Sequence, residues 1–186
     1  MARGRNNGIF RSATSGLSDL RPKEWDDNRE RQLKLKRHSW QVMVGNTIFL
    51  EARNLAPILG CERVYLKFEG SNPTGTQKDR IAMVLADQAV TSGLEGITTA
   101  TCGNFGVAVA YASRHYDLAA HIYIPQKYEV PKDRLRRMEN FGAKVHFVEG
   151  YYEEAVAYSS QQAIENNWFD ANPGMNEVSE SSLAAY

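Results

Sequence analysis

The sequence has few cysteines and no long apolar run. Its two cysteines, Cys61 and Cys102, among 186 residues do not make the disulfide framework of a small secreted domain. No apolar stretch approaches the ~18 residues that a membrane-spanning helix needs. Residues 1–7 lack the apolar core of a secretory signal. We therefore expect a cytoplasmic protein that has no membrane partner.

The chain also has no excess of charge of either sign. Lysine and arginine number 22, and aspartate and glutamate also number 22. A net charge of zero argues against a general role on nucleic acid or on a membrane surface. The histidines show no metal-ligand spacing with one another or with the cysteines, so we predict no metal site and expect them on the surface or in strands. They are His38, His115, His121 and His146.

Residues 1–40 are the exception to this charge balance. This segment contains ten Lys or Arg residues and five acidic residues, which gives it a net charge of +5. We interpret it as a mobile or surface-draped basic arm. The alternative is a nucleic-acid contact, but the segment lacks the alternating aromatic residues of a stacking platform.

From residue 44 onward, strand patterns alternate with helix patterns. The candidate strands are 64–68, 96–100, 121–124, 144–148 and 168–170. The candidate helices are 79–92, 104–115, 132–141 and 152–166. This alternation predicts an α/β fold with a parallel sheet covered by helices on both faces. Ligands in such folds bind at the carboxyl ends of the strands, and we expect the two turn-forming runs at 71–78 and 101–106 to lie at those ends.

The most informative stretch is the turn-forming run before the first of these helices, residues 71–78, which we call the lysine bend. It follows the apolar run 64–68 and places Lys78 where the turn becomes a helix. A lysine held on a rigid element beside a buried strand can become a usable amine nucleophile. A lysine in the first turn of a helix is more often simply solvated, so position alone does not assign chemistry to it.

A second strand–turn–helix unit contains the run Thr101-Cys102-Gly103-Asn104-Phe105-Gly106, which we call the glycine bend. Its two glycines leave backbone N–H groups free at the start of a helix of small residues. Such groups hold anions, including carboxylates and phosphates. Taken alone, most bends of this kind only make tight turns.

Together, the two bends resemble those of the fold-type II pyridoxal-phosphate enzymes, and most of all threonine synthase. The resemblance rests on Asn72-Pro73-Thr74-Gly75-Thr76-Gln77-Lys78-Asp79-Arg80 followed by the glycine bend, and it covers roughly residues 40 to 186. Similar segments are 44–50, 122–125, 141–145 and 170–173. Two positions depart from the family pattern: Ile48 stands where proline is usual, and Gln77 where an apolar or aromatic residue is usual.

The resemblance implies that Lys78 carries pyridoxal 5'-phosphate through its amine and then moves the proton of the substrate α-carbon. It implies that Asn104 donates to the phenolic oxygen of the cofactor; in the alternative reading, Asn104 only caps the helix that follows. It also implies a clamp for the substrate carboxylate, made by Thr101, Cys102, Gly103, Asn104 and Phe105. We expect Asp79 and Arg80 to be structural, as a helix-start acid and an ion-pairing base.

The implied activity is that of a lyase acting on an amino acid, in which water replaces the phosphate of O-phosphohomoserine to give threonine. The alternatives are a serine/threonine dehydratase, a cysteine or cysteate synthase, and a non-catalytic chain such as a truncated product or a subunit of a split enzyme. Family members are usually dimers and about twice as long. We therefore expect a fragment whose full-length form is a homodimer.

This reading divides the chain into four segments. We predict the basic arm at 1–40, the lysine-bearing segment at 41–95, a small βα subdomain with the glycine bend at 96–166, and the start of an incomplete second domain at 167–186. Residues 180–186 are predicted to form a helix that is cut short at the end of the chain.

Overall fold

The computed structural model describes residues 27–173. The chain divides into two units, residues 1–35 and residues 36–186. The helix predicted at 180–186 lies outside the described residues.

Helix α1 (Asp27–Met43) carries an ion pair between Glu30 and Lys34, one turn apart. This helix was not predicted from the sequence. Within residues 27–173, no helix combines the length and the apolar character that crossing a membrane requires.

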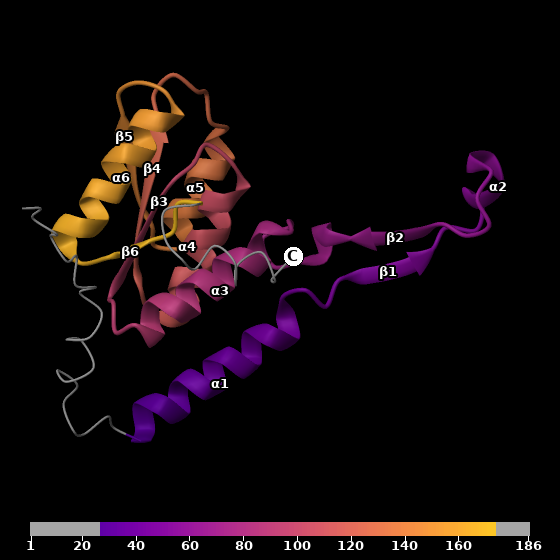
Figure 1. Cartoon of the computed structure of the whole chain (residues 1–186), viewed down its shortest axis with the longest axis horizontal. Helices are drawn as coiled ribbons and strands as arrows, with labels where there is room; N and C mark the ends of the chain where they lie inside the picture. The colour runs from indigo at the N-terminus through magenta and orange to yellow at the C-terminus, as the bar shows by residue number, and fades with distance from the viewer. Residues whose placement is uncertain (1–26, 174–186) are drawn as a thin grey trace, which may run out of the picture. The chain divides into compact units, whose positions relative to one another are not determined.

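A four-stranded parallel sheet forms the centre of the second unit (Figure 1). Its order is β5 (Lys144–Val148), β4 (Ala119–Pro125), β3 (Gly96–Ala100) and β6 (Phe169–Asp170). All five residues of β3 are buried, as expected for a central strand covered on both faces. The bounds of β3 and β5 are those that the sequence predicts.

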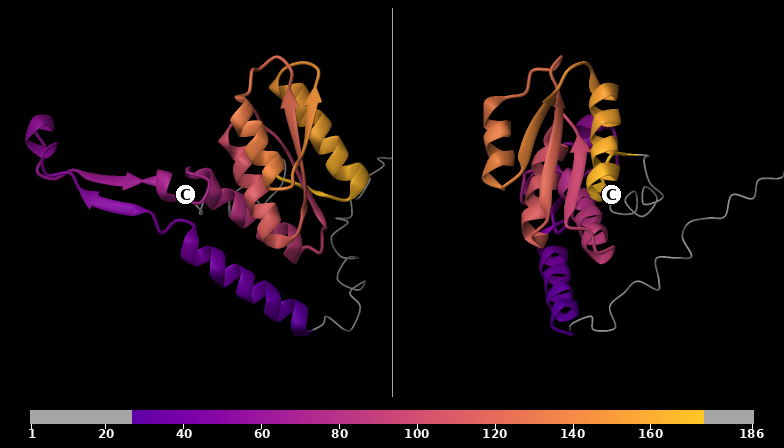
Figure 2. Two further views of the ribbon diagram at one scale, coloured as in Figure 1. Left: turned by 180° about the vertical axis from the view of Figure 1, so that it is seen from behind. Right: turned by 90° about the vertical axis from the view of Figure 1, so that its left-hand side faces the viewer.

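Helices cover both faces of this sheet (Figure 2). Helix α6 (Tyr152–Asn166) lies on one face, and α3 (Lys78–Thr91), α4 (Asn104–Tyr116) and α5 (Lys132–Asn140) lie on the other. The prediction of an α/β fold with helices on both faces is therefore confirmed. Helix bounds differ from the predicted ones by at most one residue at either end.

Adjacent residues of β4 show how the two faces are packed. Tyr123 points to α6 and packs in one cluster with Ala155. Ile122 points the other way, towards Gly106 in the first turn of α4. A Cβ atom at Gly106 would lie 3.2 Å from Ile122 Cγ2 and 2.8 Å from Met138 Cε of α5. The absence of a side chain at residue 106 therefore lets α4 approach the sheet and α5 closely.

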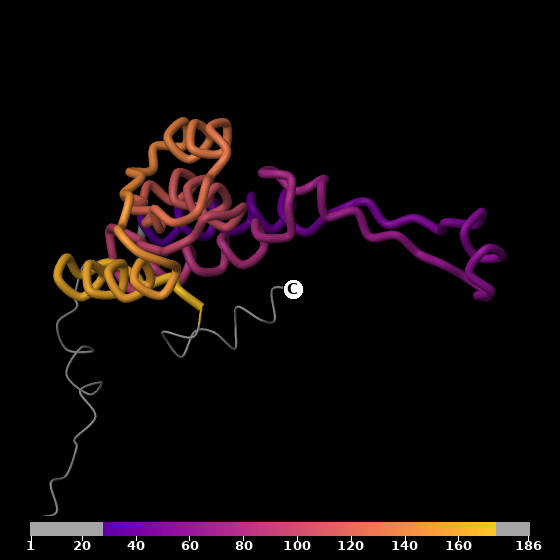
Figure 3. Tube along the Cα trace, turned by 90° about the horizontal axis from the view of Figure 1, so that it is seen from above, coloured from indigo at the N-terminus to yellow at the C-terminus, as the bar shows by residue number. Residues whose placement is uncertain are grey.

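The prediction that residues 64–68 form a buried strand of the parallel sheet is wrong. Strand β2 (Tyr65–Phe68) pairs antiparallel with β1 (Ile48–Glu51), in register Ile48 to Phe68, and both strands are exposed along their whole length. Phe49 is 64% exposed. The hairpin, with the short helix α2 (Ala56–Leu59) between its strands, lies apart from the parallel sheet (Figures 1 and 3). An apolar run specifies an extended segment, but it does not specify which strand pairs with it.

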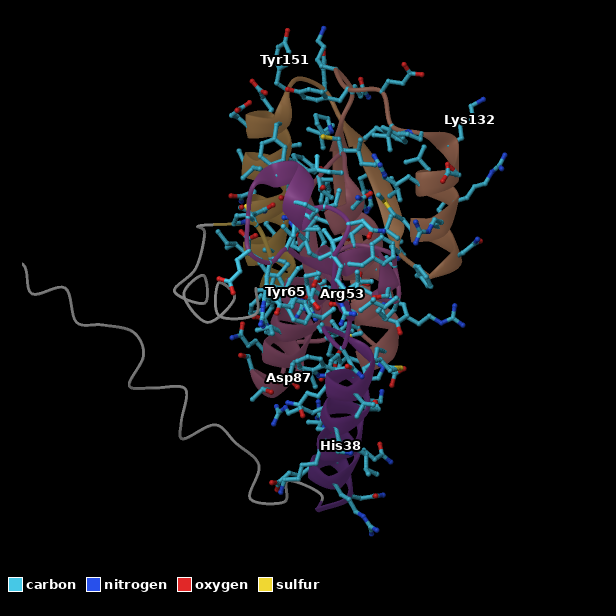
Figure 4. All side chains as sticks on the ribbon, turned by 90° about the vertical axis from the view of Figure 1, so that its right-hand side faces the viewer. His38, Arg53, Tyr65, Asp87, Lys132 and Tyr151 are labelled. Carbon is cyan, nitrogen blue, oxygen red and sulfur yellow. The ribbon has the colours of Figure 1, made fainter. Side chains whose placement is uncertain are left out.

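One carboxylate makes several of the bonds that hold the second half of α1 against the α3–α4 pair. Asp87 of α3 accepts hydrogen bonds from Arg37 Nε at 3.0 Å and Arg37 Nη2 at 2.8 Å, and from the hydroxyl of Tyr116 at 2.8 Å. Figure 4 labels Asp87 on α3 and His38 on α1. Burial, reinforced by the negative charge of Asp87, raises the pKa of Tyr116 above its usual range. The phenol therefore remains a donor to Asp87 at any physiological pH.

Two histidines meet on the α6 face of the sheet. His121 Nδ1 and His146 Nε2 lie 3.1 Å apart, while the ring centroids are 5.3 Å apart and the ring planes differ by only 7°. Rings with this geometry lie edge to edge, so the contact is a hydrogen bond in which one ring donates to the other. Trp168 stacks on His121 at a centroid distance of 3.8 Å. His121 is 7% exposed, and both histidines lie in strands, which is one of the two locations expected from the sequence.

We expect Asp87→Asn to lower the free energy of unfolding by about 1–3 kcal/mol, because it removes the charge from a half-buried group with several hydrogen bonds. Urea denaturation measures this loss. The matched control is Asp117→Asn, which removes the exposed partner of Lys36, another α1 residue; the Asp117 side chain is 83% exposed. Its loss should stay within about 0.5 kcal/mol. Equal losses in the two variants would contradict this account of how α1 is anchored.

The His121–His146 pair should make the fold sensitive to acid. Burial, the charge of His146 and that of Lys144 lower the pKa of His121 to about 4. The unfolded chain binds this proton near pH 6.5 and the folded chain does not, so stability should fall as the pH falls from about 6.5 to about 4.

The measurement is urea denaturation at several pH values. His121→Gln should reduce the slope of stability against pH in this window by up to about 1.4 kcal/mol per pH unit. His38→Gln, at an exposed position, is the control and should leave the slope unchanged. A slope that is the same in wild type and His121→Gln would show that the buried ring is not the group that titrates.

Candidate active site

The lysine bend is a compact series of turns between β2 and α3. The 3-10 turn η3 (Glu69–Ser71) leads into it, and the Gly75 N–H donates to the Asn72 carbonyl at 2.8 Å. Gly75 has φ +87°, a conformation that residues with a side chain rarely adopt. Lys78 is the first residue of α3 and is half-buried. The bend follows β2 and not a strand of the parallel sheet, so the prediction that it lies at a carboxyl end of that sheet is wrong.

Asp79 fastens this bend to the helix. Its side chain is fully buried, and it accepts hydrogen bonds from the Thr74 N–H at 2.6 Å and from the Thr74 hydroxyl. Burial raises the pKa of Asp79, while the bonds from Thr74 and the positive charge of Arg137 act in the opposite direction. The carboxylate therefore closes the loop from Thr74 to Asp79, immediately beside Lys78, which is the structural role expected for it.

Arg80 links the lysine helix to the segment before β1. Its guanidinium makes two hydrogen bonds of 2.8 Å to the carboxylate of Glu69 and one of 3.0 Å to the Gly45 carbonyl. Thr47 also donates to Glu69, at 2.9 Å. The Arg80 hydrogen bonds hold the pKa of Glu69 at about 2. Gly45 has φ +84°, and a Cβ atom there would lie 2.5 Å from Arg80 Nη1, so this position requires glycine on two grounds.

The glycine bend follows β3 at the carboxyl end of the parallel sheet, as predicted. The Thr101 N–H donates to the Tyr123 carbonyl at 2.9 Å, and the Gly103 N–H donates to the Thr101 hydroxyl at 3.1 Å. The helix that follows is capped by Gly103 without a side-chain bond, and Asn104 is its first residue. The alternative reading of Asn104 as a helix cap is therefore wrong. The Asn104 side chain is exposed.

One buried residue that supports the glycine bend was not assigned a role from the sequence. Asn172, 2% exposed, accepts a hydrogen bond from the Ala100 N–H at 2.8 Å and donates to the Ser159 hydroxyl at 2.7 Å. It thereby joins β3, α6 and the segment after β6 just before the bend begins. The Asn-Pro pair at 172–173 was the available signal, but its partners are distant in the sequence.

A cavity of about 230 Å³ brings the two bends together. Lys78 from the lysine bend and Thr101 and Phe105 from the glycine bend line it, whereas Cys102, Gly103 and Asn104 are not among its lining residues. The remaining lining residues are Ile81, Ala100, Tyr152 and Pro173. The cavity therefore combines a primary amine, the hydroxyls of Thr101 and Tyr152, and largely apolar walls.

Tyr152 is the polar residue of the cavity wall that was not predicted from the sequence. It is the first residue of α6. Helices α5 and α6 begin at the same end of the sheet, as Figure 4 shows by the labels on Lys132, the first residue of α5, and on Tyr151, the residue before Tyr152. Burial, with smaller effects of Cys102 and Glu153, raises the pKa of Tyr152. Its phenol is therefore a neutral hydrogen-bonding group in the cavity wall. An aromatic residue just after a strand was the signal available.

Among residues 27–173, no group of three or more His, Cys, Asp or Glu side chains is placed to hold a metal ion. The polar side chains that line the cavity are those of Lys78, Thr101 and Tyr152, which offer one amine and two hydroxyls.

Known proteins resemble part of the chain. It is 32% identical to the threonine synthase of Synechocystis sp. over 116 residues, which are 62% of this chain and 30% of that protein. It is 34% identical to tryptophan synthase beta chain 1 of Sulfurisphaera tokodaii over 113 residues, 59% of this chain and 27% of that one. The matched region thus spans 27–30% of the length of these relatives.

The fold also matches solved structures. The structure of maize serine racemase superposes with a TM-score of 0.67 at 19% identity, over 82% of this chain and 46% of that one. The family model described as pyridoxal-phosphate dependent enzyme matches residues 41–181, which include both bends and every residue that lines the cavity. The chain therefore belongs to the pyridoxal-phosphate dependent enzymes of fold type II.

Proposed function

We propose that this chain is the lysine-bearing part of a lyase similar to threonine synthase, which replaces the phosphate of O-phosphohomoserine by water. The observation that carries the proposal is the cavity where Lys78 meets Thr101 and Phe105 of the glycine bend. The resemblance to threonine synthases supports the choice of substrate. An amino-acid substrate, a cytoplasmic location and a homodimeric full-length form belong to the same proposal.

The cavity residues fit pyridoxal 5'-phosphate, the cofactor on which this family depends. Lys78 offers a half-buried primary amine on a rigid helix, and Ile81 and Phe105 supply apolar walls beside it. We assign the covalent attachment to Lys78 and the contact with the phenolic oxygen to Asn104. When bound, the cofactor supplies an electron sink for the substrate α-carbon.

Lys78 has a second role in this proposal. Once the amine of the substrate has taken its place, Lys78 Nζ is the base that takes and returns the proton at the α-carbon. The fixed start of α3 favours this role, because the Asp79–Thr74 bonds limit how far the backbone of Lys78 can move. A base held within reach of its proton gains rate through orientation.

The glycine bend would hold the substrate carboxylate. The N–H groups of residues 102–105 lie at the start of α4, where the helix dipole favours negative charge. In the structure the Gly103 N–H donates to the Thr101 hydroxyl. An incoming carboxylate would accept a hydrogen bond from this N–H in place of the hydroxyl, and a second one from the Thr101 hydroxyl itself. This exchange would replace one hydrogen bond within the bend by two to the carboxylate.

Two alternatives remain within this proposal. A serine/threonine dehydratase or a cysteine or cysteate synthase would use the same residues. The 34% identity to a tryptophan synthase beta chain supports this alternative, because it shows that the chain is similar to relatives other than threonine synthases. A non-catalytic chain, or one subunit of a split enzyme, would retain the fold without turnover. Assays of phosphate release from O-phosphohomoserine, and of keto-acid release from serine and threonine, separate these cases.

We expect protein incubated with pyridoxal 5'-phosphate to gain a visible absorbance band that borohydride bleaches, with the label on Lys78 in peptide mapping. Lys78→Ala should abolish the band, because the amine that makes the linkage is gone. Lys132→Ala, at an exposed position on α5, is the matched control and should retain it. A label on another lysine, or none on wild-type protein, would contradict the proposal.

A further inference from the structure

Helix α5 contacts both bends through two arginines. Arg137 Nη2 donates to the Thr74 carbonyl of the lysine bend at 2.8 Å. Arg134 Nη1 donates to the Cys102 carbonyl of the glycine bend at 3.1 Å. The two carbonyls belong to segments 28 residues apart in the sequence, yet one helix face binds both.

This face of α5 is fixed to the rest of the fold. Met138 is fully buried and lies against α4, where a Cβ atom at Gly106 would come within 2.8 Å of its Cε. Arg114 of α4 donates to the Asn140 carbonyl at the end of α5, at 2.9 Å. Residues 134, 137 and 138 share one side of the helix, because 137 and 138 lie three and four positions after 134. Arg136 lies outside this set and is exposed.

Arg137 completes the hydrogen bonding of Thr74. The N–H and the hydroxyl of this residue donate to Asp79, and its carbonyl accepts from Arg137. Thr74 is 4% exposed, so water has little access to it. The positive charge of Arg137 also acts on the buried carboxylate of Asp79. The bend before Lys78 is thus held from the α3 side by Asp79 and from the α5 side by Arg137.

We propose that Arg134 and Arg137 are positioning residues, through which α5 fixes the lysine bend and the glycine bend relative to each other. This inference rests on the proposed function, because the two bends carry the amine and the carboxylate clamp of that reaction. Each arginine acts on its own bend: Arg137 sets the start of α3, and Arg134 sets the N–H groups of residues 102–105. Neither side chain is among those that line the cavity, so neither is a catalytic residue.

Hydrogen exchange followed by mass spectrometry on the cofactor-free chain tests the proposal. Arg137→Met should speed exchange about ten-fold in peptides covering residues 74–79 and leave residues 101–106 as in wild type. Arg134→Met should give the opposite pattern. This magnitude corresponds to the loss of one hydrogen bond from a charged donor. Arg136→Met, on the exposed side of the same helix, is the matched control and should change neither bend.

A second readout concerns the cofactor. In Arg137→Met the concentration of pyridoxal 5'-phosphate needed to form the visible band should rise about ten-fold, because Lys78 is less well placed. Arg137→Lys should restore much of this loss, since lysine keeps a cationic donor. Arg134→Met should leave the band unchanged, because it acts on the other bend.

The proposal is supported if each variant speeds exchange only in the bend that its arginine contacts and leaves exchange elsewhere as in wild type. Wild-type exchange at both bends in both variants overturns it, and so does faster exchange throughout the chain, which indicates general destabilisation. Failure of wild-type protein to form the band at Lys78 overturns the proposed function instead. The exchange measurements need no cofactor and decide the positioning of the bends independently.

Discussion

A buried carboxylate next to the candidate nucleophile is the contact on which the site depends. Asp79 has little access to water, and burying an unpaired charge is costly. The cost is offset because Asp79 accepts both donors of Thr74 and lies near the charge of Arg137. The same contacts that stabilise the carboxylate therefore determine the conformation of the chain just before Lys78.

The two bends are held in different ways. The glycine bend follows the central strand of a parallel sheet, where every neighbouring residue is fixed by packing and by bonds such as that from Ala100 to Asn172. The lysine bend follows an exposed hairpin strand, so the sheet does not support it. Polar contacts take the place of packing there: Arg80 with Glu69 towards the preceding segment, and Asp79 with Thr74 towards the helix.

The sequence predicts those parts of the fold that depend on local pattern. Strand β3 and helix α6 have the predicted bounds because a buried apolar run and an amphipathic stripe with acids in its first turn are sufficient local signals. The partner of residues 65–68 was predicted wrongly because pairing is a long-range property. Helix α1 was not predicted, because its charged sequence carries little helical periodicity of apolar residues. The docking of its second half depends on Asp87, some fifty positions away.

The same distinction applies to the site. Lys78 and the glycine bend were found because each lies in a short motif, and the cavity brings Lys78 together with Thr101 and Phe105. Arg134 and Arg137 gave no signal, since each contacts a backbone carbonyl that any residue offers. The roles proposed for Asn104 and for the N–H groups of the bend stay predictions.

The stacking of Trp168 on His121 has a consequence for how the chain can be observed. The indole and imidazole centroids are 3.8 Å apart, and a Cβ atom at Gly96 would lie 2.3 Å from the indole ring, so glycine leaves room for this arrangement. A protonated imidazole in contact with an excited indole accepts electron density from it and quenches its light emission. The fluorescence intensity of Trp168 should therefore fall when His121 is protonated, so this tryptophan reports the charge on the buried histidine.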